Sequence, residues 1–212
     1  MAKKQPEVTK ATMERLAKSF WHLYEQRPIE RISVREITEN AGCNHATFYL
    51  YFRSVRDLLN KIEASLLDAR DTKLKELTDG GRLDFTSLVF FAQTDLIPYA
   101  RVLLGPHGDP AFEREAEERI WPYLRMLMEQ AGTPGLQTED DDDTQAELTK
   151  RFYLSGINGV IKALLANPAI FEMTDVGEFI RDRILGTTKT ARQSRLSTLP
   201  HSRNPESRPP EQ

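Results

Sequence analysis

The chain has 212 residues, of which 39% are hydrophobic and 29% are charged, and its net charge is −3 at pH 7. This composition is typical of a soluble globular protein and argues against a membrane protein, because no apolar run approaches the ~20 residues that a membrane span needs. The first residues lack the apolar stretch of a signal peptide, and the one cysteine, Cys43, has no intrachain partner. We therefore expect a cytoplasmic protein of one or two compact bodies without disulfides.

The charges are unevenly distributed along the chain. Residues 1–60 carry 10 Lys and Arg against 7 Asp and Glu, residues 61–186 carry 14 against 23, and residues 187–212 carry 5 against 2. An acidic body is repelled by a polyanion. If the protein binds a polyanion, we therefore expect the first segment to make the contact.

Apolar residues recur at helical spacing over almost the whole chain, and no stretch alternates in the period-two manner of a half-buried strand. The predicted fold class is therefore all-α. We expect a first helix over residues 8–26, which Pro28 ends, and a long helix over residues 55–78, which Gly80 and Gly81 terminate. Further helices are expected over residues 84–97, 98–105, 111–131, 145–167 and 175–186.

Two prolines, an acidic run and the last segment complete this pattern. Pro98 and Pro122 are expected to bend or restart the helices that contain them. The acidic run at residues 138–143 lacks the ligand spacing and the glycine of a calcium loop, so we interpret it as a solvated loop. Residues 187–212 are rich in Ser, Arg and Pro and too poor in apolar residues to offset their ordering entropy, so we expect a disordered tail.

Two short helices joined by a tight turn are predicted between residues 33 and 52. Ser33 stands three residues before Glu36, which is the spacing of a capping box at the start of a helix. Gly42 suits the position just past the end of that helix, where a positive φ is usual, and Asn44 can cap the next helix. With the long helix that precedes them, these elements predict a helix-turn-helix.

The second short helix has one face suited to a core and another suited to DNA. At about 100° per residue, Phe48 and Phe52 share one face, whereas Ala46 and Leu50 lie on the opposite face. An outward leucine suits a major groove, where alkyl groups contact the thymine methyl group. The alternative is an ordinary three-helix bundle with a leucine exposed by chance. Thr47, Tyr49 and Tyr51 offer hydroxyls at the margins of the outer face that can contact phosphates, and His45 in the first turn can contact a phosphate or a guanine edge.

This segment resembles the TetR family of bacterial transcription repressors over about residues 10–70. The resemblance implies a DNA-binding head at residues 10–70 and an all-helical regulatory body at residues 71–186 that dimerises, with the tail at residues 187–212 beyond it. The matching residues are Ser33-Val34-Arg35-Glu36-Ile37, then Ala41-Gly42 with Asn44, and Thr47-Phe48-Tyr49-Leu50-Tyr51-Phe52 followed by Asp57-Leu58-Leu59.

The resemblance also implies which residues contact DNA. Ser33 and Arg35 would contact phosphates from the first short helix, and the second short helix would meet bases and backbone. The family usually has Lys at the start of the following helix, where this chain has Val55, so Arg53 or Arg56 would replace it. The residues expected at the DNA are Ser33, Arg35, Asn44, His45, Ala46, Thr47, Tyr49, Leu50, Tyr51, Arg53 and Arg56.

The predicted helix over residues 145–167 carries a stripe of small residues, which lets two helix backbones approach closely. We interpret this helix and the next one as a dimer interface of four helices, two from each subunit. From the residues alone, packing against a helix of the same chain is an equal alternative, and the resemblance favours the dimer. The interface residues would be Ser155, Gly156, Gly159, Ala163, Phe179, Ile180 and Ile184.

Several predicted helices of the body contribute aromatic and flexible side chains, which are able to line a ligand cavity. The commoner role of such residues is core packing, so both interpretations stay open. A ligand held there would be small and either hydrophobic or cationic. The candidate pocket residues are Phe90, Phe91, Tyr99, Trp121, Met126 and Phe152.

We therefore predict a homodimeric regulator that binds double-stranded DNA, most simply a repressor released by a small molecule. One alternative is a similar DNA binder without a small ligand, either constitutive or controlled by a partner protein. A more remote alternative is a helical enzyme or lipid-binding protein. The four histidines are scattered, and neither a nucleophile motif nor a phosphate-binding glycine loop is found, so no catalytic residue, cofactor or metal is expected.

Overall fold

The computed structural model describes residues 6–81, 83–84, 88, 97–133, 143–167 and 173–184. The regular secondary structure of these residues is helical throughout, which confirms the all-α prediction. The tail predicted from residue 187 lies outside the described residues, as does most of the helix predicted over residues 84–97.

The helices follow the predicted order, with small shifts at their ends and one unpredicted 3-10 turn. The amino-terminal part contains α1 (Pro6–Tyr24), the 3-10 helix η1 (Ile29–Arg31), α2 (Val34–Asn40), α3 (His45–Tyr49) and α4 (Val55–Asp79). The rest of the described chain contains α6 (Ile97–Leu103), α7 (Pro110–Gln130), α8 (Asp143–Ala166) and α9 (Met173–Ile184).

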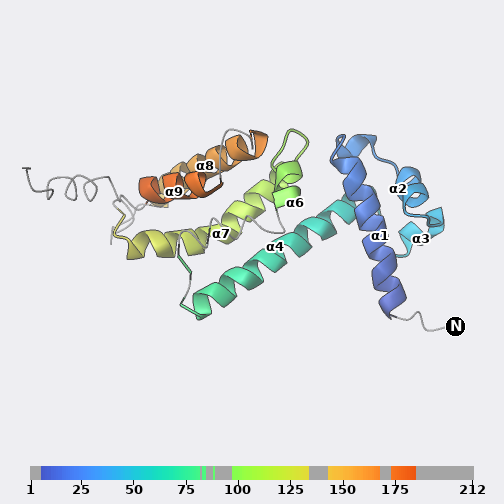
Figure 1. The fold of residues 1–212 in the computed structure, drawn as a ribbon, viewed down its shortest axis with the longest axis horizontal. Coiled ribbons are helices and arrows are strands. Elements are labelled where there is room, and N and C mark those ends of the chain that lie inside the picture. Colours follow the sequence, from blue (N-terminus) through green and yellow to red (C-terminus); the bar gives the residue numbers. More distant parts are fainter. Residues whose placement is uncertain are drawn as a thin grey trace, which may run out of the picture.

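The molecule is elongated, with a small head at one end and a larger body at the other (Figure 1). α1, α2 and α3 gather at the head, and α4 runs from the head along the body. α7 packs on α4, α8 packs on α7, and α9 lies against α8, so the body is built in layers. α4 is therefore the described helix that connects the two parts.

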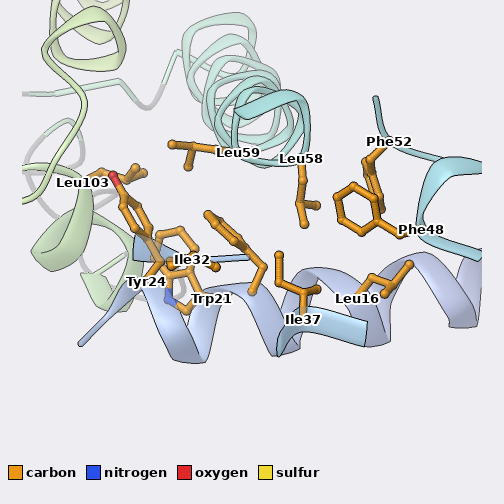
Figure 2. Packing of buried hydrophobic residues seen from close by; sticks show 11 residues of the cluster. Leu16, Trp21, Tyr24, Ile32, Ile37, Phe48, Phe52, Leu58, Leu59 and Leu103 are labelled. Carbon is orange, nitrogen blue, oxygen red and sulfur yellow. The ribbon is translucent and has the colours of Figure 1, made fainter. Parts of the chain in front are cut away.

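The head is held together by a core to which α1, α2, α3 and α4 each contribute. Phe48 is fully buried and Phe52 is 3% exposed, which confirms that these two rings anchor α3. Leu16, Ile37 and Leu58 pack around them from the other three helices (Figure 2). Leu103 of α6 reaches the same core, so the body contributes to it as well (Figure 2).

The body has a second core, formed where α7, α8 and α9 meet. α7 runs unbroken through Pro122, so the predicted restart at this residue does not occur. Pro122 lies on the exposed side of α7, where the backbone carbonyl that loses its helical partner can bind water instead. The buried residues of this core are Leu124, Leu127, Met128, Leu154, Leu164, Val176 and Ile180.

Candidate nucleic-acid interface and internal cavity

The start of α2 is fixed by the predicted capping box. The Glu36 N–H donates to the Ser33 hydroxyl at 3.2 Å, and the Ser33 N–H donates to the Glu36 carboxylate at 3.0 Å. Arg27 adds a 2.6 Å ion pair to the same carboxylate. The backbone hydrogen bond from Ser33 and the hydrogen bond from Arg27 lower the pKa of Glu36 to about 2, so this cap stays charged near neutral pH.

The turn between α2 and α3 is also set by local hydrogen bonds. Gly42 has a φ of +61° and donates its N–H to the Glu39 carbonyl at 3.2 Å. The Cys43 N–H donates to the Thr38 carbonyl at 2.9 Å, which completes a Schellman motif. Asn44 then caps α3 by accepting the Ala46 N–H at 2.9 Å. These local hydrogen bonds therefore determine the direction in which α3 leaves α2.

α3 is shorter than the predicted helix, because it ends at Tyr49 and Leu50 is its C-cap. The chain has to leave the helix early, since the Ser54 hydroxyl already caps the next helix, α4. The backbone still curls after Leu50, and the Phe52 N–H donates to the Phe48 carbonyl at 2.9 Å. Phe52 therefore remains on the inner side, as the helical spacing predicted.

The outer side of α3 is exposed. Tyr49 is 54% exposed and Leu50 is 65% exposed, whereas Phe48 on the inner side is fully buried. The His45 ring packs edge-on against Tyr49, with 5.2 Å between the ring centroids. Among the residues expected at the DNA, Asn44, His45, Ala46, Tyr49 and Leu50 are exposed, and Thr47 and Tyr51 are half-buried.

The three arginines expected at the DNA have different surroundings. Arg35 is exposed on α2 and pairs with Glu39, one turn further along, at 2.7 Å. Arg56 is held at the body, because its guanidinium donates to Asp109 at 2.5 Å. Arg53 is exposed and forms no ion pair within the described part of the chain.

The head and the body meet at a joint formed by the end of α1, by α4 and by the segment from α6 to the start of α7. The Tyr24 hydroxyl donates to the His107 carbonyl at 2.8 Å, and the Trp21 and Tyr99 rings pack with their centroids 4.6 Å apart. Asp109 accepts the Ala111 N–H as the N-cap of α7 and also holds Arg56. A displacement of α6 would therefore also change the position of the head.

A cavity of about 190 Å³ lies between α4, α6, α7 and α8. Its walls are mainly apolar. The described lining residues comprise Leu66, Leu67, Leu74, Leu88, Tyr99, Ala100, Leu103, Leu104, Phe112, Ala116, Ile120, Leu124, Leu154, Ile157 and Ile161, together with the polar residues Arg70, Glu113, Glu117 and Asn158.

The cavity shares only Tyr99 with the described part of the predicted pocket. Trp121 and Met126 are half-buried on α7 outside the lining, and Phe152 is 75% exposed on α8. Phe90 and Phe91 lie outside the described residues. The two lining glutamates, Glu113 and Glu117, were not predicted, although their four-residue spacing on an expected helix places them on one face.

The small residues expected at the dimer interface form an exposed strip on α8. Ser155, Gly156, Gly159 and Ala163 are all exposed. A Cβ atom added at either glycine would meet no other atom within 4 Å, so these glycines do not pack closely against another described helix. On α9, Phe179 is 50% exposed, Ile180 is buried in the body core, and the Ile184 side chain lies outside the described residues.

In the described residues, no group of three or more His, Cys, Asp or Glu side chains is placed to hold a metal ion. Within the same residues, no helix has both the length and the apolar character to cross a membrane.

Residues 21–62 match the family model of bacterial regulatory proteins of the tetR family. This segment runs from the last turn of α1 into α4 and contains the capped turn and the outer face of α3. Comparison with curated proteins finds no significant match to the sequence.

Solved structures share the fold over most of the chain. The fatty acid degradation regulator FadR from Bacillus halodurans has a TM-score of 0.59 and 17% identity, over 89% of this chain and 99% of that one. A TetR transcriptional regulator from Streptococcus agalactiae 2603V has a TM-score of 0.61 and 19% identity, over 84% and 96%. The dihydroxyacetone kinase operon activator DhaS has a TM-score of 0.54 and 16% identity, over 84% and 96%. The chain thus matches the tetR family of bacterial regulatory proteins over residues 21–62 and shares the fold of these solved structures over most of its length.

Proposed function

We propose that the protein is a homodimeric transcriptional regulator of the bacterial cytoplasm, and that it represses transcription until a small ligand releases it from double-stranded DNA. The observation that carries the proposal is the outer face of α3. On this face Tyr49 and Leu50 are exposed, the small Ala46 leaves room for a close approach, and the buried Phe48 lies on the opposite, inner side. An amphipathic recognition helix in a helix-turn-helix has these properties.

The proposed DNA contacts follow from the exposed side chains of the head. Leu50 contacts a thymine methyl group, and Tyr49 and His45 contact bases or phosphates in the major groove. The Ser33 hydroxyl donates to Glu36 at 2.8 Å, so Arg35 supplies the phosphate contact of α2. Arg53 takes the place of the family lysine, because Arg56 is held by Asp109.

The dimer is proposed to form through the exposed strip of α8 and the outer side of α9. The exposed Phe152 and Phe179 flank the small residues of this strip, so a second copy would bury apolar surface there. Two heads must then present their recognition helices about 34–36 Å apart to enter successive major grooves on one DNA face.

Ligand control is proposed to act through residues shared by the cavity and the head core. Leu103, Tyr99 and Phe112 line the cavity and also pack against the core of the head. A ligand that prefers one position of α6 thus also prefers one position of the head. The ligand can change the free energy of DNA binding by no more than the difference between its own binding free energies for the DNA-binding and the released conformation of the protein.

Selection of bound sequences from random duplexes, followed by titration of the selected duplex, tests the DNA-binding proposal. Tyr49→Ala is expected to weaken binding, and Leu50→Ala to relax the choice of base, each by ~1–3 kcal/mol. Both variants should keep the wild-type unfolding midpoint, because both side chains are exposed. Wild-type affinity and base preference in both variants would reject the assignment of α3.

The phosphate contact proposed for Arg35 is tested against a control variant in the second half of α4. Arg35→Ala should reduce the slope of log affinity against log salt by about 1, as expected for one lost phosphate contact. Lys73→Ala removes the same charge from an exposed site in the second half of α4 and should leave the slope unchanged. Equal slopes for the two variants would exclude Arg35 from the interface.

The sign of regulation needs a separate measurement, because DhaS, which shares the fold, is an activator. We expect a reporter gene placed behind the selected sequence to be less active when the protein is present. Higher reporter activity would replace repression with activation and leave the DNA-binding proposal standing.

A further inference from the structure

The lining of the cavity contains two carboxylates. Glu113 and Glu117 project from α7 into the lining, and Asn158 of α8 lies between them. The Asn158 side-chain amide donates to Glu117 and lies 3.5 Å from a Glu113 oxygen. A neutral amide therefore connects two carboxylates at the edge of an otherwise apolar space.

The two carboxylates differ in how their charge is balanced. Lys162 forms an ion pair with Glu113 at 2.5 Å. Glu117 has no cationic partner among the described residues, and its hydrogen-bond partner there is the uncharged Asn158. The balance around the cavity therefore leaves one negative charge without a counterion.

The cationic side chain in the lining does not supply that counterion. Arg70 donates from Nε and Nη2 to Asp71 at 3.2 and 3.0 Å, and from Nη1 to the Ala116 carbonyl at 3.2 Å. Burial lowers the pKa of Arg70 and the hydrogen bond to Asp71 raises it, but a guanidinium stays protonated at neutral pH. The Arg70 charge is thus already paired with that of Asp71.

The rest of the cavity suits a small apolar group. Tyr99, Leu103 and Phe112 form the wall next to the head, and leucines of α4 form another wall. The volume of about 190 Å³ is somewhat larger than the ~150 Å³ apolar cavity that accepts benzene. A single ring or a short alkyl chain therefore fits.

We propose that the cavity binds a small cationic amphiphile, with its ammonium group beside Glu117 and its apolar body against Leu103, Tyr99 and Phe112. The ammonium donates hydrogen bonds to the half-buried Glu117 carboxylate and supplies the counterion that this charge lacks. A carboxylate ligand would instead place a third negative charge beside two glutamates. The link between this ligand and DNA release rests on the proposed function, whereas the binding itself does not.

Calorimetric titration of the full-length protein at pH 7 with n-hexylamine, 1-hexanol and hexanoate tests this proposal. The three probes have the same alkyl chain and carry a positive, a zero and a negative charge. We expect the amine to bind tightest and the carboxylate weakest, with at least about tenfold between these two. Hexanoate binding as tightly as the amine would overturn the proposal and would indicate an anion held by Arg70.

A matched pair of variants locates the charge. Glu117→Gln should lower the amine affinity about tenfold and leave the hexanol affinity unchanged, so hexanol also reports that the cavity is intact. Glu118→Gln removes the same charge from the next residue, which is exposed, and should leave all three affinities unchanged. Equal amine affinities in the two variants, or no binding of any probe to the wild type, would overturn the proposal.

The effect of the ligand on DNA affinity is measured separately. Amine binding that leaves the affinity for the selected duplex unchanged would support the ligand class and contradict ligand-controlled release. Failure of the wild-type protein to bind any selected duplex would reject the proposed function without affecting the titrations.

Discussion

Glu63 of α4 is a carboxylic acid buried at the joint between head and body. The residue is 8% exposed, and its Oε1 atom is buried without a hydrogen-bond partner among the described residues. Burial is the largest of the effects that raise the pKa of Glu63 to about 7; the nearby charges of Asp109 and Glu115 act in the same direction, and Arg56 opposes them. The ionised form of Glu63 is therefore destabilising.

The size and sign of this effect follow from the two pKa values. An increase of the pKa from 4.5 in an unperturbed side chain to about 7 in the folded protein corresponds to about 3 kcal/mol. The folded protein binds the proton more tightly than the unfolded chain does. The stabilisation by this proton is therefore fully present below pH 4.5 and is lost as the pH rises through about 7.

Glu63→Gln keeps the shape of the side chain and removes the ionisation. At pH 8 the variant should be more stable than the wild type by up to about 3 kcal/mol, and the difference should shrink towards pH 4.5. Urea unfolding of both proteins at a series of pH values and one protein concentration measures this difference. Glu76→Gln, at an exposed position of the same helix, should change the stability by less than about 0.5 kcal/mol throughout. A Glu63→Gln variant no more stable at pH 8 than the wild type, or a difference independent of pH, would refute this reasoning.

Four further substitutions test the head and the dimer strip. Ser33→Ala removes the N-cap of α2 and should lower the unfolding free energy by about 1 kcal/mol in urea titrations; an unchanged value would show that this cap is dispensable. Arg53→Ala should weaken binding to all duplexes and lower the salt slope by about 1, whereas Arg56→Ala should leave the slope unchanged and cost ~0.2–1 kcal/mol of stability; the reverse result would exchange their roles. Gly159→Arg should yield a folded monomer in sedimentation experiments, since a Cβ there meets no atom within 4 Å, and an intact dimer would move the interface elsewhere.

The parts of the head that could be predicted from the sequence depend on neighbours in the chain. The box between Ser33 and Glu36, the positive φ of Gly42 and the cap at Asn44 each involve residues at most four positions apart. Such contacts form whenever the local backbone adopts a helix start or end, so residue type and spacing are sufficient to predict them.

The joint and the cavity could not be predicted in this way. Arg56 and Asp109 are 53 residues apart in the chain, and only the packing of α7 on α4 brings them together. Helical spacing shows which side chains share one face of a helix. It does not show whether that face meets the core, a cavity or a second subunit. Phe152 was therefore expected in a pocket, although it is exposed on the strip proposed to meet a second subunit.

The central claim is that the exposed side of α3 lies in the major groove, and methylation protection of the selected duplex tests it most directly. Guanine N7 lies in the major groove, and adenine N3 lies in the minor groove. The account predicts protection of guanine N7 in two patches about one helical turn apart, and loss of this protection in the Tyr49→Ala protein at the same concentration. Protection confined to adenine N3, or guanine protection that is unchanged in Tyr49→Ala, would contradict it.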